Sequence, residues 1–157
     1  MINDTDKKYL KRCIELAKTA LENNDEPFGS VLVSADGEVL MEDHNHVAGG
    51  DHTQHPEFAL ARWAANNMTP EERSKATVYT SGEHCPMCSA AHGWVGLGRI
   101  VFASSTEQLT QWLDELGVAP SRVRNLSIQD VIRDAEVDGP VPELAEEVRK
   151  LHEQFHS

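Results

Sequence analysis

The order of a strand, a helix and a second strand in the middle of the chain constrains its fold most strongly. The segment 76–81 predicts a strand, residues 86–95 predict a helix, and the apolar run 99–103 predicts a further buried strand. Two strands separated by a helical crossover pair in parallel, whereas a tight turn joins antiparallel strands. The sequence therefore predicts a sheet that contains at least one parallel pair.

An earlier connection predicts antiparallel pairing. Asp36 and Gly37 separate the apolar runs 29–34 and 38–43, and an Asp-Gly pair in that position is typical of a hairpin turn. Upstream of the hairpin, apolar side chains recur at helical spacing over about residues 4–23. This spacing predicts an amphipathic helix whose apolar stripe faces the core.

Three further segments predict helices. Residues 56–67 contain no helix breaker beyond the first position, where proline is tolerated. The segment 69–72 has a capping-box pattern with proline at the first helical position, which predicts a short helical turn. Residues 106–116 predict another helix.

The last third of the chain is less regular. Residues 126–128 predict a short edge strand, and 129–133 predict a turn after it. Two prolines open a final helix at about residues 140–156, where apolar side chains share one stripe. We expect a single domain over residues 1–157 that includes this helical tail.

Two short motifs at predicted helix starts carry the chemistry: His55-Pro56-Glu57 and Cys85-Pro86-Met87-Cys88. An imidazole and two thiols are ligands that Zn²⁺ prefers, and catalytic zinc sites use about three protein ligands with the last position open. Helix amino termini favour the thiolate form that zinc requires. Glu57 binds no metal in this arrangement, so it is free to move the protons of a water molecule. The two motifs predict a hydrolytic zinc site.

The cysteine pair alone has two other interpretations, a redox pair or half of a structural zinc site. The only other cysteine, Cys13, lies on the predicted first helix and leaves no second pair to complete a structural site. His92 is a rival ligand to His55, because it follows Cys88 by four residues and would share its helix face. We favour His55, because only this histidine is followed by Glu57 two residues later.

Charge and hydropathy limit the class of partner. The chain has 14 Lys and Arg against 26 Asp and Glu, a net charge of −12, which repels a phosphate backbone. A nucleic-acid substrate is therefore disfavoured, although a local basic patch would remain compatible with this average. The amino terminus lacks the apolar core of a signal peptide, and no apolar run reaches the roughly 18 residues of a membrane span. We expect a cytoplasmic protein without a membrane anchor.

These motifs resemble those of the cytidine deaminase-like superfamily of zinc-dependent nucleobase and nucleoside deaminases, over about residues 8–116. The sequence is most similar to the branch of bacterial guanine deaminases and tRNA adenosine deaminases, and the resemblance implies a three-layer α/β/α sandwich around a five-stranded mixed sheet. It also implies a homodimer. The matching positions are Pro27-Phe28-Gly29-Ser30-Val31-Leu32-Val33, Asn45, His55 and Glu57, Cys85-Pro86-Met87-Cys88, and Trp94 six residues after Cys88.

The resemblance implies a role for each site residue. His55, Cys85 and Cys88 hold Zn²⁺, although a mixed nitrogen and thiolate site also suits iron or another divalent metal. Glu57 takes a proton from the attacking water and passes it to the substrate. Asn45 binds the ring and Trp94 stacks on it, as in the relatives.

Two of these substrate contacts have structural alternatives. The side chain of an asparagine after a strand often hydrogen-bonds the backbone of a turn, so a turn can also explain Asn45. A tryptophan on a buried helix is often core, so Trp94 can be explained by packing. Phe28 and Trp63 are expected in the core.

Two departures from the family pattern bear on the substrate. Pro56 replaces the usual Ala between His and Glu, a mild change in a first helical turn. His84 replaces the usual Pro before the first Cys and could contact the leaving amino group, orient the substrate or bond a carbonyl; we favour the carbonyl. The loop before the site is also rich in histidine, with His44, His46 and His52.

The expected function is the zinc-dependent deamination of a free purine such as guanine, with release of ammonia. Alternatives within the family are a cytosine or nucleoside deaminase and a tRNA adenosine deaminase. A non-catalytic, zinc-stabilised binding protein on the same fold is the alternative outside enzymes. The presence of Glu57 argues against this last interpretation.

Overall fold

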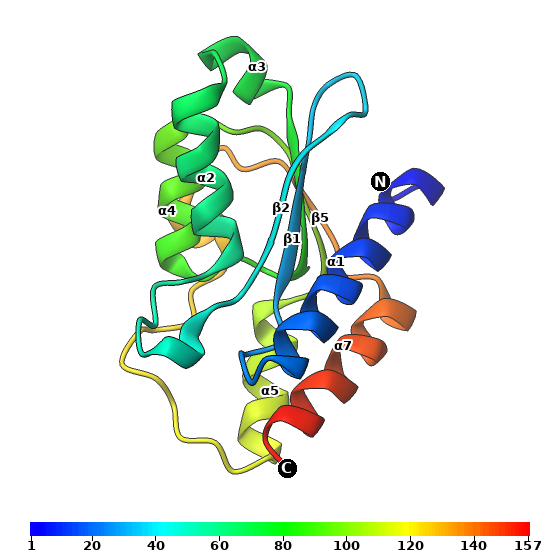
Figure 1. Ribbon diagram of the computed structural model, residues 1–157, viewed down its shortest axis with the longest axis vertical. Coiled ribbons are helices and arrows are strands. Elements are labelled where there is room, and N and C mark those ends of the chain that lie inside the picture. The colour runs from blue at the N-terminus through cyan, green and yellow to red at the C-terminus, as the bar shows by residue number, and fades with distance from the viewer.

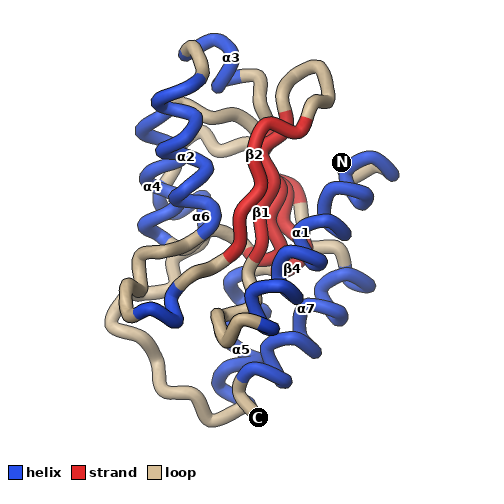
Figure 2. The backbone as a smooth tube through the Cα atoms, in the orientation of Figure 1, coloured by secondary structure: helices blue, strands red, loops and turns tan.

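The computed structural model describes residues 1–157 and contains a five-stranded sheet in the order β2-β1-β3-β4-β5. Strand β1 pairs antiparallel with β2 and β3, whereas β3 pairs parallel with β4 and β4 with β5. Both predicted kinds of pairing are thus confirmed in one mixed sheet, drawn in red in Figure 2. The strands are β1 (Gly29–Val33), β2 (Val39–His44), β3 (Thr77–Gly82), β4 (Ile100–Ser104) and β5 (Val137–Asp138).

Helices cover both faces of this sheet (Figure 1). One face carries α1 (Asp4–Glu22) and α7 (Pro142–Phe155), with α5 (Thr106–Glu115) packed against α7. The other face carries α2 (Pro56–Asn67) and α4 (Pro86–Val95), with the short α6 (Ile128–Val131) against α4. The expected three-layer α/β/α sandwich is confirmed. Two short pieces complete the chain, α3 (Pro70–Ser74) and the 3-10 helix η1 (Val47–Gly49).

The strand β1 separates two apolar cores. All five of its residues are buried, and successive side chains of a strand point to opposite faces. Val31 accordingly belongs to the cluster under α1 and α7, and Leu32 to the cluster under α2. Burial on both faces explains why this segment reads as a continuous apolar run, with one polar exception at Ser30.

A partly buried ion pair fixes the first helix to the sheet. Arg99 donates to Asp6 with an Nη1–Oδ1 distance of 2.9 Å, and the Tyr79 hydroxyl donates to the same oxygen at 2.7 Å. Burial alone would raise the pKa of Asp6, but the hydrogen bonds from Arg99 and Tyr79 outweigh it and lower the pKa to about 2. Arg99 also donates to Asp138 of β5 at 2.9 Å. This network holds four separate segments together.

The carboxy-terminal third differs from the prediction. The strand expected at 126–128 is wrong, because Ile128 begins α6, and the fifth strand lies instead at Val137–Asp138. The turn expected at 129–133 is largely the helix itself. The amide of Ile128 donates to the carboxylate of Glu83 at 2.9 Å, so it does not join a strand ladder. The final helix is confirmed.

None of the helices combines the length and the apolar character that crossing a membrane requires.

Candidate active site

The three predicted metal ligands lie together at the starts of two neighbouring helices. His55 is the N-cap of α2, Cys85 is the N-cap of α4, and Cys88 follows in the first turn of α4. The Nδ1 atom of His55 lies 3.4 Å from Sγ of Cys85 and 3.6 Å from Sγ of Cys88. Proline follows each N-cap residue, which fixes where both helices begin. The two helix starts thus bring together residues that lie 30 positions apart in the chain.

The spacing of these atoms fits a tetrahedral zinc ion. Zn–N and Zn–S bonds of about 2.1 and 2.3 Å at the tetrahedral angle separate nitrogen from sulfur by about 3.6 Å. The observed separations of 3.4 and 3.6 Å agree with this value. One imidazole and two thiols leave the fourth position open, as a catalytic zinc site requires.

Hydrogen bonds within the metal group, His55, Cys85 and Cys88, shift the pKa values of its members, and they favour the thiolate form of Cys85. The hydrogen bond from Cys88, together with that from His55, lowers the pKa of Cys85 to about 4. Cys88 is the partner that keeps the proton, so its pKa is raised, and burial raises it further. The hydrogen bond to Cys85 raises the pKa of His55 to about 9. Metal binding would therefore release protons, since zinc takes up thiolates and a neutral imidazole.

Glu57 is the buried acid beside this group. Burial and, second, the charge of Cys85 raise the pKa of Glu57 to about 7. A carboxyl group with a pKa near neutrality can both accept and return a proton at ordinary pH. Glu57 is therefore suited to general acid and base catalysis.

Ser30 is a contact of Glu57 that the sequence interpretation missed. Its hydroxyl lies 3.4 Å from Oε1 of Glu57 and 3.0 Å from Oγ1 of Thr80. Thr80 donates in turn to the carbonyl of Gly82 at 2.9 Å. The signal in the sequence was a hydroxyl within the otherwise apolar run of β1, where a buried polar group needs a partner.

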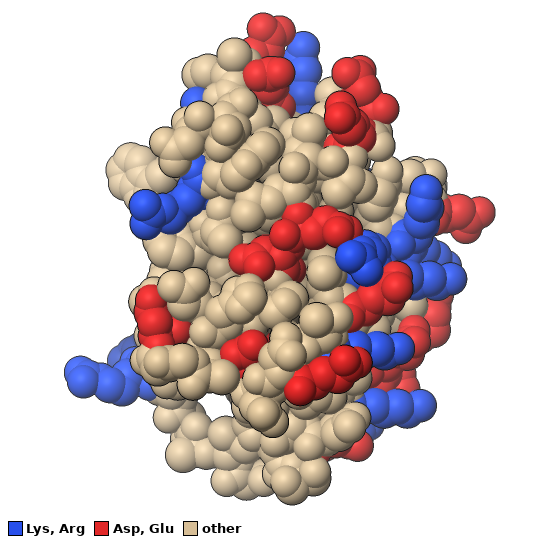
Figure 3. All heavy atoms as spheres, viewed as in Figure 1, with Lys and Arg blue, Asp and Glu red and all other residues tan.

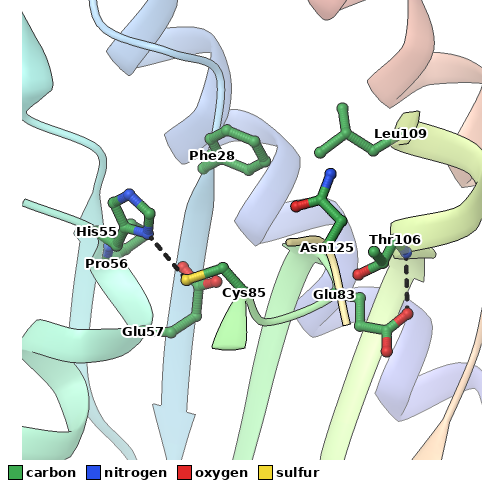
Figure 4. A pocket seen from close by; sticks show the side chains of 9 residues that line it. All are labelled: Phe28, His55, Pro56, Glu57, Glu83, Cys85, Thr106, Leu109 and Asn125. Carbon is green, nitrogen blue, oxygen red and sulfur yellow. Dashed lines mark hydrogen bonds between the residues drawn. The ribbon is translucent and has the colours of Figure 1, made fainter. Parts of the chain in front are cut away.

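A pocket opens over this group, as Figure 4 shows. Glu57 and Cys85 lie on one side of it, and Leu109 of α5 and Asn125 of the following loop lie on the other. Phe28 contributes an apolar wall, so the expectation that it is only core is wrong: the ring lies just before β1, at the end of the sheet where the pocket opens. The lining residues are Phe28, His55, Pro56, Glu57, Glu83, Cys85, Thr106, Leu109 and Asn125.

Glu83 positions the far wall of the pocket. Its carboxylate accepts from the amide of Thr106 and from the amide of Ile128, each at 2.9 Å. These amides belong to the first turns of α5 and α6, whose amide groups lack partners inside the helix. One side chain thus fixes the starts of two helices that flank the loop carrying Asn125.

Comparison with known proteins places the chain in a family. Residues 3–104 match the model of the cytidine and deoxycytidylate deaminase zinc-binding region. The chain belongs to this deaminase family. It is a zinc-dependent enzyme, and the family's zinc chemistry agrees with the group formed by His55, Cys85 and Cys88.

Individual relatives of the deaminase differ in their named activities. A probable cytosine deaminase of Schizosaccharomyces pombe is 34% identical over 119 residues, which cover 76% of this chain and 72% of that protein. A guanine deaminase of Bacillus subtilis is 33% identical over 98 residues, 61% of this chain and 62% of that protein. The solved structure of a guanine deaminase from Nitrosomonas europaea has the same fold, with a TM-score of 0.71 at 17% identity over 99% of this chain and 86% of that one.

Asn45 is buried and does not line the pocket. Its Oδ1 accepts from the amide of Val47 at 2.9 Å, which is the turn interaction considered as an alternative. Its Nδ2 has no hydrogen-bond partner. The turn therefore uses only one end of this amide.

His84 does not occupy the expected position. The imidazole is buried, does not line the pocket and has no hydrogen-bond partner at either ring nitrogen, so the favoured bond to a carbonyl is wrong. The ring lies 5.4 Å from that of His92, perpendicular to it. Burial lowers the pKa of His84 well below its ordinary value, which keeps the imidazole neutral.

Trp94 differs from both interpretations considered for it, whereas His92 lies outside the metal group as expected. Trp94 is 89% exposed, so it neither lines the pocket of this chain nor fills the core. Six residues correspond to about 120° around a helix, which turns Trp94 away from the face of Cys88. His92 donates through Nε2 to the carbonyl of Gly98 at 2.8 Å. His92 does not belong to the group formed by His55, Cys85 and Cys88, so it is no rival to His55 as a metal ligand.

Proposed function

We propose that this deaminase hydrolyses the exocyclic amino group of a free nucleobase-type heterocycle, with guanine as the first candidate. The observation that carries the proposal is the position of Glu57. This buried carboxyl group has a pKa raised to about 7 and lies against the predicted zinc ligands, at the base of an open pocket. Such a group can accept a proton from the attacking water and then donate a proton to the departing ammonia.

Each residue of the site has one task in this reaction. His55, Cys85 and Cys88 would hold the zinc ion, which lowers the pKa of a water molecule toward neutrality. Glu57 takes one proton from the water and delivers it to the ring nitrogen. It then transfers the second proton to the departing amine. The water oxygen bonds to the carbon that carries the amino group, and the bond from this carbon to the amine breaks as the carbonyl forms. Water and the amine thus yield a carbonyl group and ammonia, and the ring nitrogen keeps the first proton.

The walls of the pocket suit a flat, partly polar ring. Phe28 and Leu109 offer apolar contact, and aromatic faces bind planar rings well. Asn125 offers a donor and an acceptor, the pair that recognises an amide-like edge of a base. The backbone amide of Asn45 donates to the carbonyl of Phe28 at 3.0 Å, and its unpartnered Nδ2 is a further donor.

Guanine is supported by the similarity to the guanine deaminase of Bacillus subtilis. Cytosine is the second candidate, because the probable cytosine deaminase of Schizosaccharomyces pombe matches a larger share of the chain. Transfer RNA is less well supported, since the net charge is −12. Figure 3 shows acidic side chains across the middle of one face, with Lys and Arg toward its rim.

We also propose that the enzyme acts as a homodimer. The exposed indole of Trp94 supports this proposal, because tryptophan is enriched at interfaces and costly to leave in water. Light scattering of the purified protein should give about twice the mass of one chain. A Trp94→Ala variant should shift that mass toward the monomer.

Ammonia release from guanine, cytosine, adenine and their nucleosides tests the function. The zinc-loaded wild type should act on guanine, and Glu57→Gln should keep its zinc while losing about 10²- to 10⁴-fold in kcat. Turnover of cytosine alone would replace guanine by the second candidate. No ammonia from any of these compounds, or equal rates in Glu57→Gln, would overturn the proposal.

A further inference from the structure

A second group of side chains that could hold a metal ion lies outside the pocket. Asp25, His44 and His46 each place one ligand atom within 4.8 Å of the other two. Asp25 lies in the turn between α1 and β1, His44 ends β2, and His46 precedes η1. None of the three lines the pocket described above.

Hydrogen bonds leave one ligand atom free on each imidazole. His44 donates through Nδ1 to the carbonyl of Asn45 at 3.0 Å, and His46 donates through Nε2 to the carboxylate of Asp43 at 3.1 Å. A ring nitrogen that faces a carbonyl or carboxylate oxygen carries the hydrogen, so the opposite nitrogen keeps its lone pair. Histidines that bind metals almost always make this kind of bond through their other nitrogen.

The third member supplies the negative charge. Asp25 is only 5% exposed, and its Oδ1 accepts from the amide of Ala48 at 2.9 Å. That bond fixes the carboxylate and leaves Oδ2 available. A buried carboxylate with no cationic side chain against it is costly, and a bound cation removes that cost.

The group is also accessible to an ion from solvent. The side chain of His46 is 48% exposed, and its ring lies 4.3 Å from that of His44 at an angle of 35°. The two imidazoles form the outer side of the group, and Asp25 forms the buried side. An ion can therefore enter without any change in the core.

We propose that Asp25, His44 and His46 bind a second Zn²⁺ ion, separate from the one assigned to His55, Cys85 and Cys88. Two imidazoles and a carboxylate suit zinc and similar divalent transition metals, whereas Mg²⁺ and Ca²⁺ favour oxygen ligands alone. Water completes the coordination. The ion ties the turn after α1 to the loop that leads from β2 toward His55.

Cobalt titration of the metal-free full-length protein distinguishes the two sites, because Co²⁺ takes zinc ligands and reports them by colour. A site with two thiolates gives an intense charge-transfer band in the near ultraviolet, whereas a site of imidazole and carboxylate gives only weak visible bands. The wild type should bind two equivalents of Co²⁺, of which only one produces the thiolate band.

Variants assign the second equivalent. His46→Ala and Asp25→Asn should bind one equivalent and keep the thiolate band at full intensity. Asp25→Asn retains an oxygen that accepts from Ala48, so the turn keeps its hydrogen bond. His52→Ala is the matched control, because His52 is an exposed histidine of the same loop outside the group. It should bind two equivalents.

The intact thiolate band shows in the same experiment that each variant is folded. Zinc measurements by mass spectrometry should repeat the pattern, with two ions per chain in the wild type and one in His46→Ala. A wild type that saturates at one equivalent would overturn the proposal. So would a second equivalent that persists in both His46→Ala and Asp25→Asn.

Discussion

The ring of Phe28 packs edge-on against the imidazole of His152, with 5.0 Å between the ring centroids. Phe28 lines the pocket, and His152 lies buried on α7, the last helix of the chain. Trp112 of α5 also lies beside this imidazole, with 6.2 Å between the ring centroids. The carboxy-terminal helix thus supports a wall of the active site, although it contributes no residue to the pocket itself.

The burial of His152 makes stability sensitive to mild acid. Burial and, second, the charge of His156 lower the pKa of His152 to about 4. As the pH falls below the unfolded value of about 6.5, the unfolded chain takes up a proton that the native state resists, so stability is lost until about pH 4. Between pH 7 and pH 5 this loss is about 2 kcal/mol. Urea unfolding of wild type and His152→Phe at both values should show the smaller loss in the variant, and equal losses would refute the assignment.

The Asp6–Arg99 pair governs stability at lower pH. The folded pKa of Asp6 is depressed to about 2, so its contribution is complete above the unfolded pKa and disappears as the pH falls toward 2. Asp6→Asn should cost about 2 kcal/mol at pH 7 and less near pH 2. Asp4→Asn is the control, because Asp4 is an exposed acid in the same helical turn. A difference between wild type and Asp6→Asn that does not change with pH would contradict the ion pair.

Loss of the Ser30 hydroxyl should move the pH dependence of the reaction. The bond from Ser30 favours the ionised form of Glu57, so its removal raises the pKa of that carboxyl group. The acid limb of kcat/KM in Ser30→Ala should shift to higher pH by about 0.5 to 1 unit. Ser34→Ala, beyond the end of the same strand, should leave the profile unchanged. An unshifted profile for Ser30→Ala would remove Ser30 from the site.

Glu83→Gln should weaken substrate binding without loss of zinc. An amide offers one acceptor oxygen, so one of the amides of Thr106 and Ile128 then faces an NH₂ group, at a cost of about 1–3 kcal/mol. We expect KM to rise, since both amides hold segments that border Asn125. Glu107→Gln, an exposed acid in the first turn of α5, is the control. An unchanged KM would show that substrate binding does not depend on the hydrogen bonds between Glu83 and these two amides.

Much of the fold follows from local sequence signals. The helices 56–67 and 86–95 begin and end as predicted, because a proline marks each start and the last residues are followed by a break in pattern. The strand predicted at 126–128 fails for the opposite reason. Its residues have no strong preference for strand over helix. The side chain of Glu83, which is distant in the sequence, binds the amide of Ile128 and so favours the start of α6 there.

Some residues of the candidate site were likewise predictable from the sequence, and others were not. The grouping of His55, Cys85 and Cys88 was predictable from their chemistry, because one imidazole and two thiols suit a zinc ion. Trp94 was misplaced, because stacking depends on which way a helix faces, and sequence spacing does not fix that direction relative to the pocket. Leu109 and Asn125 were missed since their positions depend on the packing of α5.

Two portions of the chain line the pocket. His55, Glu57 and Cys85 fall within the segment 3–104 that defines the family, whereas Thr106, Leu109 and Asn125 follow it. Phe28 also lies within this segment, so in the proposed function the reaction belongs to the first stretch and the contacts to the base are shared between both. Exchange of the stretch between β4 and α6 therefore offers a way to change which base is bound while His55, Glu57 and Cys85 are kept.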